Sequence, residues 1–167
     1  MASLLLGVVA ALKRKTAGPH SFRWMCLSAI FLYMSVDEAV GLHELLTEPT
    51  RRLLGLEAKG VLYFAWVIPG MVVGAALALW YWTLLLSLPT RTKWQFVLAA
   101  VLFVGGAIGM ELVGGVYYRP EGATLAYSVV STIEETLEMA GVIVFINALL
   151  RYLAEQYREC RVTFRES

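Results

Sequence analysis

Acidic side chains recur inside apolar stretches of this sequence, where membrane-spanning helices rarely carry charge. The residues concerned are Asp37, Glu38, His43, Glu44, Glu111, Glu134, Glu135 and Glu138. Carboxylate and imidazole groups are ligands that zinc, iron and manganese accept, and both groups can also carry protons. The residue types therefore predict a site that binds a divalent metal, another cation or protons.

The composition indicates an integral membrane protein. Of the 167 residues, 59% are hydrophobic and only 16% are charged, which is far more apolar than a soluble domain. The stretch 60–90 contains no charged residue, and a helix of about 20 apolar residues is enough to cross the hydrocarbon core. A net charge of +1 gives no reason to expect a nucleic-acid partner.

The expected fold is all-α, an integral membrane helical bundle with four transmembrane helices plus a short or truncated N-terminal apolar segment. The predicted helices span about 22–46, 61–88, 93–118 and 124–152. We expect a bend near Pro69 and Gly70 in the second helix. Residues 1–155 form a single bundle in this interpretation, residues 156–167 form a cytoplasmic polar tail, and the link 49–60 is long enough for a small surface element.

The N-terminal segment 2–12 is apolar but too short to cross a bilayer. Lys13, Arg14 and Lys15 follow this segment, whereas a secretory signal has its basic residues first. Two interpretations stay open: the end of a transmembrane helix that begins further upstream, or a short re-entrant or interfacial segment.

The basic residues predict the orientation, because cytoplasmic loops are enriched in Lys and Arg. Ten of the 14 basic residues fall on the side of the C-terminal tail, and four fall on the other side. We therefore expect the C-terminus in the cytoplasm and the links 49–60 and 119–123 outside. Trp66, Tyr63 and Tyr118 lie near expected helix ends, where aromatic belts form. Cys26 and Cys160 match no metal-binding or redox spacing.

Counting along the helices at about 1.5 Å per residue places the acids at a common depth. Asp37 and Glu38 lie roughly 21–23 Å from Arg23, and Glu111 lies roughly 27 Å from Lys93. The three glutamates 134, 135 and 138 lie roughly 20–26 Å from Arg151. Six carboxylates from three helices are therefore expected in the outer half of the bilayer, with His43 and Glu44 further out.

Small residues on the third helix predict close packing around Glu111. Ala107, Gly114 and Gly115 share its expected face, which lets a neighbouring helix approach. Gly105 and Gly109 form a GxxxG pair on another face, a possible second packing contact.

A charged carboxylate at the bilayer centre costs about 2.5–3.5 kcal/mol on insertion scales, and no Lys or Arg lies within these helices to offset that cost. A bound cation, protons or penetrating water must therefore neutralise or solvate the acids. For a metal, the expected ligands are Asp37 or Glu38 together with His43, Glu111, Glu134 and Glu138. Zinc, iron or manganese with an open coordination position could activate water or dioxygen against a lipid or a quinone.

Facing carboxylates from several helices also resemble carboxylate-bridged di-metal bundles, which use Glu-x-x-His on two helices. This chain has Glu38-x4-His43 instead, a spacing that does not place the pair on one helical face. That departure weakens a di-iron assignment.

Two further functions use the same features. The acids could be proton or cation sites of a transporter, although the chain shows no inverted repeat. Alternatively, the acids could sit hydrogen-bonded in a wet vestibule of a non-catalytic accessory or scaffold subunit, within a homo-oligomer or a larger membrane complex. The lipid bilayer is the partner in every interpretation.

The segments "SVDEAVGLHE", "GGAIGMELVGG" and "STIEETLEMAG" carry DE-x4-HE and EE-x2-E motifs. Over about residues 22–152 the pattern resembles uncharacterised bacterial multipass membrane proteins. The resemblance implies a location in the bacterial inner membrane and implies no particular activity.

Overall fold

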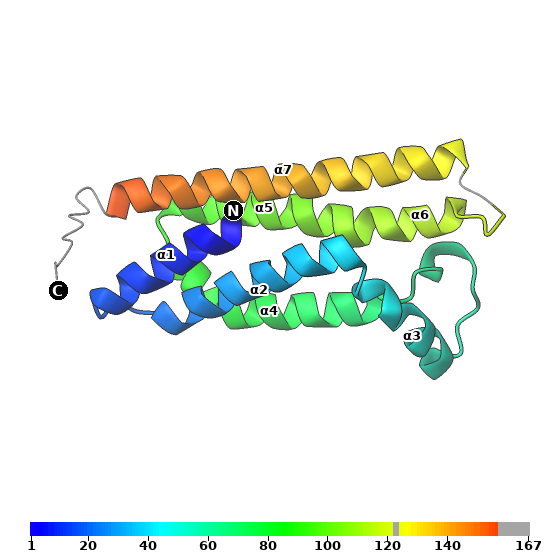
Figure 1. The fold of residues 1–167 in the computed structure, drawn as a ribbon, viewed down its shortest axis with the longest axis horizontal. Helices are drawn as coiled ribbons and strands as arrows, with labels where there is room; N and C mark the ends of the chain where they lie inside the picture. The colour runs from blue at the N-terminus through cyan, green and yellow to red at the C-terminus, as the bar shows by residue number, and fades with distance from the viewer. Residues whose placement is uncertain (122–123, 157–167) are drawn as a thin grey trace, which may run out of the picture.

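The computed structural model describes residues 1–121 and 124–156, and this part of the chain is all-helical (Figure 1). The helices are α1 (Ala2–Lys15), α2 (Ser21–Val40), α3 (Thr47–Leu54), α4 (Val67–Ser87), α5 (Thr90–Val104), α6 (Glu111–Tyr117) and α7 (Leu125–Gln156). Two short 3-10 turns, η1 (His43–Leu46) and η2 (Gly60–Leu62), flank α3, and a π-helical segment, η3 (Gly105–Met110), joins α5 to α6. The predicted all-α bundle is confirmed, and nearly all of the predicted polar tail lies outside the described residues.

Three helices of the described chain are long and apolar enough to cross a membrane: Val67–Ser87, Thr90–Tyr117 and Leu125–Gln156. A fourth span is obtained if α2 and the segment His43–Leu54, which meet at a bend of 82°, are counted together. Large apolar side chains are exposed along these helices, among them Leu79, Val101 and Ile143. Such a surface suits lipid rather than water.

The first predicted span ends earlier than expected, so the prediction of one helix over 22–46 is wrong at its C-terminal end. Helix α2 ends at Val40, because Gly41 has φ +68° and its N–H bonds Asp37 O at 2.6 Å. Glycine adopts this left-handed conformation without the steric penalty that other residues carry. The chain then turns sharply, and α3 follows inside the link where a small surface element is expected.

The second predicted span begins later than expected. Helix α4 starts at Val67, which places Pro69 and Gly70 inside its first turn instead of at a mid-helix bend. Proline is tolerated in a first turn because its missing N–H would have no intrahelical partner there. Residues 61–66 form η2 and turns in place of helix.

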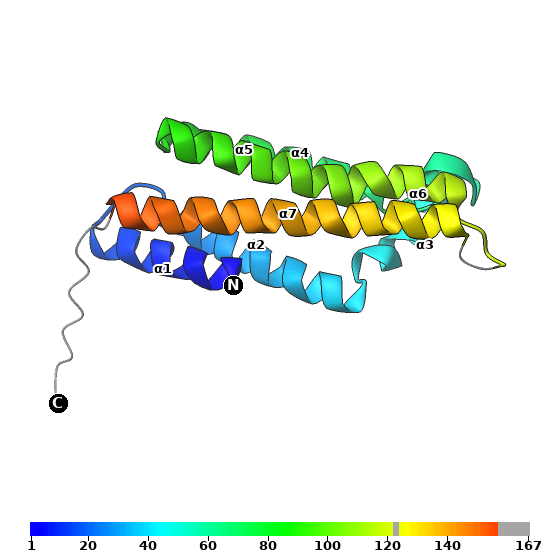
Figure 2. The same ribbon diagram turned by 90° about the horizontal axis from the view of Figure 1, so that it is seen from above.

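Helix α7 lies beside α5, η3 and α6 along their combined length (Figures 1 and 2). Helix α1 packs on α2 and α7, with Leu6 and Val9 fully buried. The hydrophobic core gathers at the end of the bundle where α2 and α5 begin and α4 and α7 end. Trp24 stacks on Tyr152 there, with ring centroids 5.5 Å apart. The apolar core therefore lies at one end of the bundle, away from the acidic residues.

Two glycines set the distance between α7 and its neighbour. A Cβ built on Gly141 would lie 2.8 Å from Ala99 O, and one built on Gly106 would lie 2.9 Å from Glu134 O. Backbone atoms cannot move aside as a flexible side chain would, so both positions require glycine. The predicted contact at Gly105 and Gly109 is not made within the described chain, since a Cβ on either would meet nothing within 4 Å.

We predict that Gly141→Ala separates α7 from α5 and destabilises the protein. Overpacking of a tight contact typically costs about 1–3 kcal/mol. The matched control is Gly74→Ala in α4, where a built Cβ meets nothing within 4 Å and alanine favours the helix. Thermal unfolding in detergent would measure both variants, and equal midpoints would contradict the proposed role of Gly141.

Candidate functional site

Carboxyl groups from α2, α6 and α7 meet at the end of the bundle opposite the hydrophobic core. The Glu134 side chain lies near those of Glu111, Glu138 and Glu38. Glu138 in turn interacts with Glu38, His43 and Glu111. We call Glu38, Glu111, Glu134 and Glu138 the carboxyl cluster. The expectation that six carboxylates lie at one depth in the bilayer stays a prediction.

The π-helical segment η3 positions Glu111 within this cluster. A π-helical turn joins residue i to residue i+5, which aligns Gly106 with Glu111 on one face. Gly106 is buried directly against the backbone of Glu134 and Glu138. The close approach at Gly106 therefore brings the Glu111 carboxyl next to that of Glu134.

Asp37 and His43 form a hydrogen-bonded pair across the turn after α2. Asp37 Oδ2 lies 2.8 Å from His43 Nδ1, and the His43 backbone N–H donates to Asp37 Oδ1 at 2.8 Å. Both side chains are mostly buried, with 18% of Asp37 and 27% of His43 exposed. An ionised carboxylate only accepts hydrogen bonds, so Nδ1 carries a proton and Nε2 is the nitrogen left for other chemistry.

Trp66 connects this pair to the carboxyl cluster. Its ring lies against the His43 imidazole, with centroids 4.4 Å apart, and its indole Nε1 donates to Glu111 Oε1 at 3.0 Å. Sequence reasoning assigned Trp66 only to an aromatic belt. No spacing rule relates Trp66 to Glu111, because the two residues meet only through tertiary packing.

Four aromatic rings cover the cluster from the loop side: Tyr63, Phe64, Tyr118 and Tyr127, which we call the aromatic cap. Tyr63 and Tyr118 have centroids 4.4 Å apart, and Tyr118 and Tyr127 have centroids 5.3 Å apart. Tyr127 interacts with the charges of Glu111 and Glu134. Burial raises the pKa of Tyr63, and the neighbouring Tyr118 adds to that rise, so Tyr63 stays a neutral phenol.

The remaining predicted ligands lie at the margin of the cluster. Glu135 is exposed on α7, and exposed Glu44 lies beside Gly41. Across residues 1–121 and 124–156, no group of three or more His, Cys, Asp or Glu side chains is arranged to hold a metal ion. This geometry gives the predicted zinc, iron or manganese site no support, and metal binding stays a prediction.

The chain belongs to the family described as Domain of unknown function (DUF8692), whose model matches residues 1–153. No curated protein matches the sequence, and neither does any solved structure. The matched range contains every residue of the carboxyl cluster and the aromatic cap. Because the family description assigns no activity, the function has to be argued from the site itself.

We predict that Asp37→Ala loosens the turn after α2, because the variant removes the acceptor of both His43 hydrogen bonds. Loss of a buried hydrogen-bonded partner typically costs about 1–3 kcal/mol. Hydrogen exchange at the His43 amide would report the local effect, and exchange should become faster. The control is Glu38→Ala, the adjacent exposed carboxylate, and equal exchange rates in the two variants would contradict the role given to Asp37.

Proposed function

We propose that the protein binds protons, or another small cation in their place, at the carboxyl cluster within the membrane. The carrying observation is that Glu111 and Glu134 are neighbours across the contact where Gly106 packs on the Glu134 backbone. Two ionised carboxylates cannot hydrogen-bond to each other because neither has a hydrogen to donate. A proton held between them satisfies both the hydrogen bond and the charge.

The surroundings of the pair support this assignment. No Lys or Arg occurs in α2 after Arg23, in α5–α6 after Lys93, or in α7 before Arg151. The spans therefore contain no permanent positive charge that could neutralise the cluster. Among the described residues, His43 is the basic side chain near it. Exchangeable cations remain as the neutralising species.

A divalent metal is the less favoured cation. A structural or catalytic zinc site uses at least three protein ligands, and the cluster offers carboxyl pairs rather than such a set in the described residues. Zinc, iron and manganese therefore remain alternatives that elemental analysis of the purified protein would test.

We further propose that the protein resides in the bacterial inner membrane with its C-terminus in the cytoplasm. The excess of basic residues at the end of the bundle that holds α1 supports this orientation. The carboxyl cluster would then lie in the outer half of the bilayer. Protons arriving from outside would meet Asp37 and His43 first, so the arrangement suits proton- or cation-coupled transport.

Infrared difference spectroscopy of protein in nanodiscs tests the proton site. We expect a carbonyl band of a protonated carboxylic acid at neutral pH, shifted in heavy water, and lost in Glu134→Gln. The glutamine keeps the shape of the side chain but cannot share a proton as an acid does.

The matched control is Glu135→Gln, because Glu135 is exposed on the same helix. The band should survive in that variant. A spectrum without a protonated carboxyl band, or a band unaffected by Glu134→Gln, would contradict the proposal. Proton flux into proteoliposomes then separates transport from binding alone.

A second candidate function is that of an accessory subunit, and the packing of α4 favours it. Only Val67 and Leu84 of this 21-residue helix are buried. The small residues Gly74 and Ala78 lie on the part of α4 that is exposed, and small residues favour helix association in membranes.

If α4 contacts another subunit, native mass spectrometry from mild detergent should find a fixed oligomer or complex. Gly74→Leu should dissociate that assembly, because a bulky side chain would keep the helices apart. A lone chain for the unmodified protein would contradict the accessory function and would leave the proton site unaffected.

A further inference from the structure

Helix α3 runs across the direction of the spans. The segment His43–Leu54 is turned by 82° from α2, and Figure 1 shows α3 at the end of the bundle where α2 ends. If α2 lies near the membrane normal, a helix turned by this angle lies close to the membrane plane. Interfacial helices adopt that orientation.

The polarity of α3 is reversed relative to that of a helix on a water-soluble protein. The side that faces the bundle carries Thr47, Thr50 and Arg51, all partly buried. The outer side carries exposed Pro49 and Leu53, with exposed Leu46 just before them at the end of η1, and Leu53 is 85% exposed. A surface helix in water would bury its leucines and expose its polar residues.

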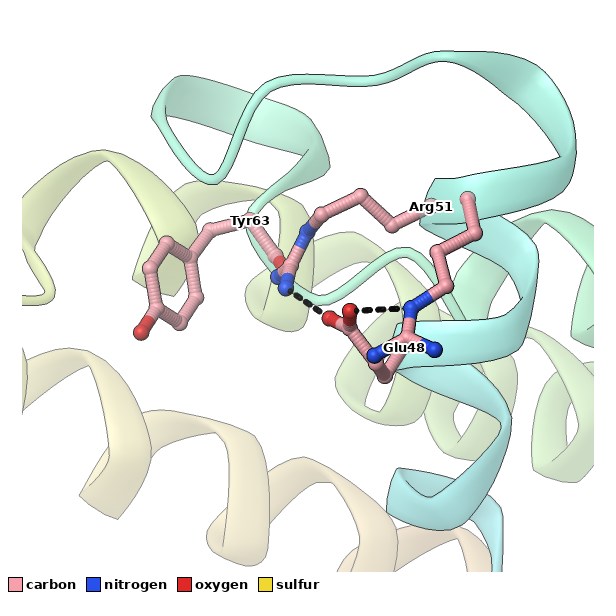
Figure 3. A network of polar contacts seen from close by, with 4 residues as sticks. Glu48, Arg51 and Tyr63 are labelled. Atoms are coloured by element: carbon pink, nitrogen blue, oxygen red, sulfur yellow. Dashed lines mark hydrogen bonds and ion pairs between the residues drawn. The ribbon is translucent and has the colours of Figure 1, made fainter.

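A charged strip runs beside the apolar residues. Glu48 pairs with Arg51 and with Arg52 at 2.8 Å each. Figure 3 shows the pairing of Glu48 with Arg51. The Arg52 side chain is 78% exposed. Leucines next to an exposed ion pair match the boundary between acyl chains and headgroups, where one side of a helix meets hydrocarbon and the other meets water.

Arg51 fixes this orientation from the protein side. Its guanidinium donates to Glu48 Oε2 at 2.8 Å and to Tyr63 O at 2.6 Å, and it lies over the Tyr63 ring at 5.5 Å. Because Arg51 faces the bundle, α3 cannot rotate its leucines inward without breaking these contacts. The apolar face of α3 is therefore held outward.

We propose that α3 is an interfacial helix that docks on the outer surface of the lipid bilayer through Leu46, Pro49 and Leu53. The occupant of this face is lipid, because the leucines are exposed in a protein whose spans also expose apolar side chains, and the exposed Glu48–Arg52 pair beside them suits a headgroup region. Through Arg51 and Tyr63 the docked helix also holds the aromatic cap in place. This inference depends on membrane insertion and not on proton binding.

Depth-dependent fluorescence quenching tests the docking. The background protein carries Cys26→Ala and Cys160→Ala, and an environment-sensitive fluorophore is attached at Leu53→Cys. The protein is reconstituted in vesicles of phosphatidylcholine and phosphatidylglycerol. We expect emission at shorter wavelength than in water, quenching by nitroxides near the headgroups, and protection from aqueous iodide.

The matched control is the same fluorophore at Arg52→Cys on the charged strip, which iodide should quench more strongly. Equal iodide quenching at the two positions would overturn the proposal, because Leu53 would then face water. Strongest quenching from nitroxides at the chain ends would also overturn it, because α3 would then be re-entrant. The infrared band of the carboxyl cluster should be unchanged in Leu53→Cys, which separates this test from that of the proton site.

Discussion

The candidate site depends on the close contact between α7 and the continuous helical segment formed by α5, η3 and α6. Gly106 and Gly141 leave no room for a Cβ between the backbones, so α7 and this segment meet at the distance that van der Waals packing allows. In a membrane this packing matters more than hydrophobic burial, because lipid is as apolar as the helix surface. The same contact that joins the helices brings Glu111 beside Glu134.

Two acid groups so close together on apolar helices are energetically unfavourable unless their charge is neutralised or hydrated. Acid groups on apolar helices lose the hydration that stabilises their charge, and the described spans contain no internal Lys or Arg that would restore it. The Trp66 indole donates one hydrogen bond to Glu111, and His43 is already hydrogen-bonded to Asp37. In the function proposed above, a shared proton would neutralise the pair without any rearrangement of the helices.

Helix content was predictable because it follows from the length of the apolar segments, and the same counting underlies the prediction that the acids share one depth. Apolar length sets where α4, α5 and α7 lie, and a rise of about 1.5 Å per residue sets the depth of Glu111 and Glu134. Gly41 alone did not reveal the end of α2, since glycine is also common inside membrane helices. The π-helical turn shifts the face of Glu111 relative to an α-helix, and Trp66 reaches Glu111 only through tertiary packing. Neither effect has a periodic signal in the sequence.

The two ends of the bundle are stabilised by different interactions, and this difference bears on how a cation would enter. Aromatic stacking of Trp24 and buried leucines hold the end near α1. The opposite end combines the rings of the aromatic cap with polar contacts of partly exposed groups, namely Asp37 with His43 and Arg51 with Tyr63. Segments with few buried apolar contacts open at lower free energy than packed cores. We therefore expect the end with the carboxyl cluster to open more readily than the α1 end, and docking of α3 as proposed above would limit how far the aromatic cap moves.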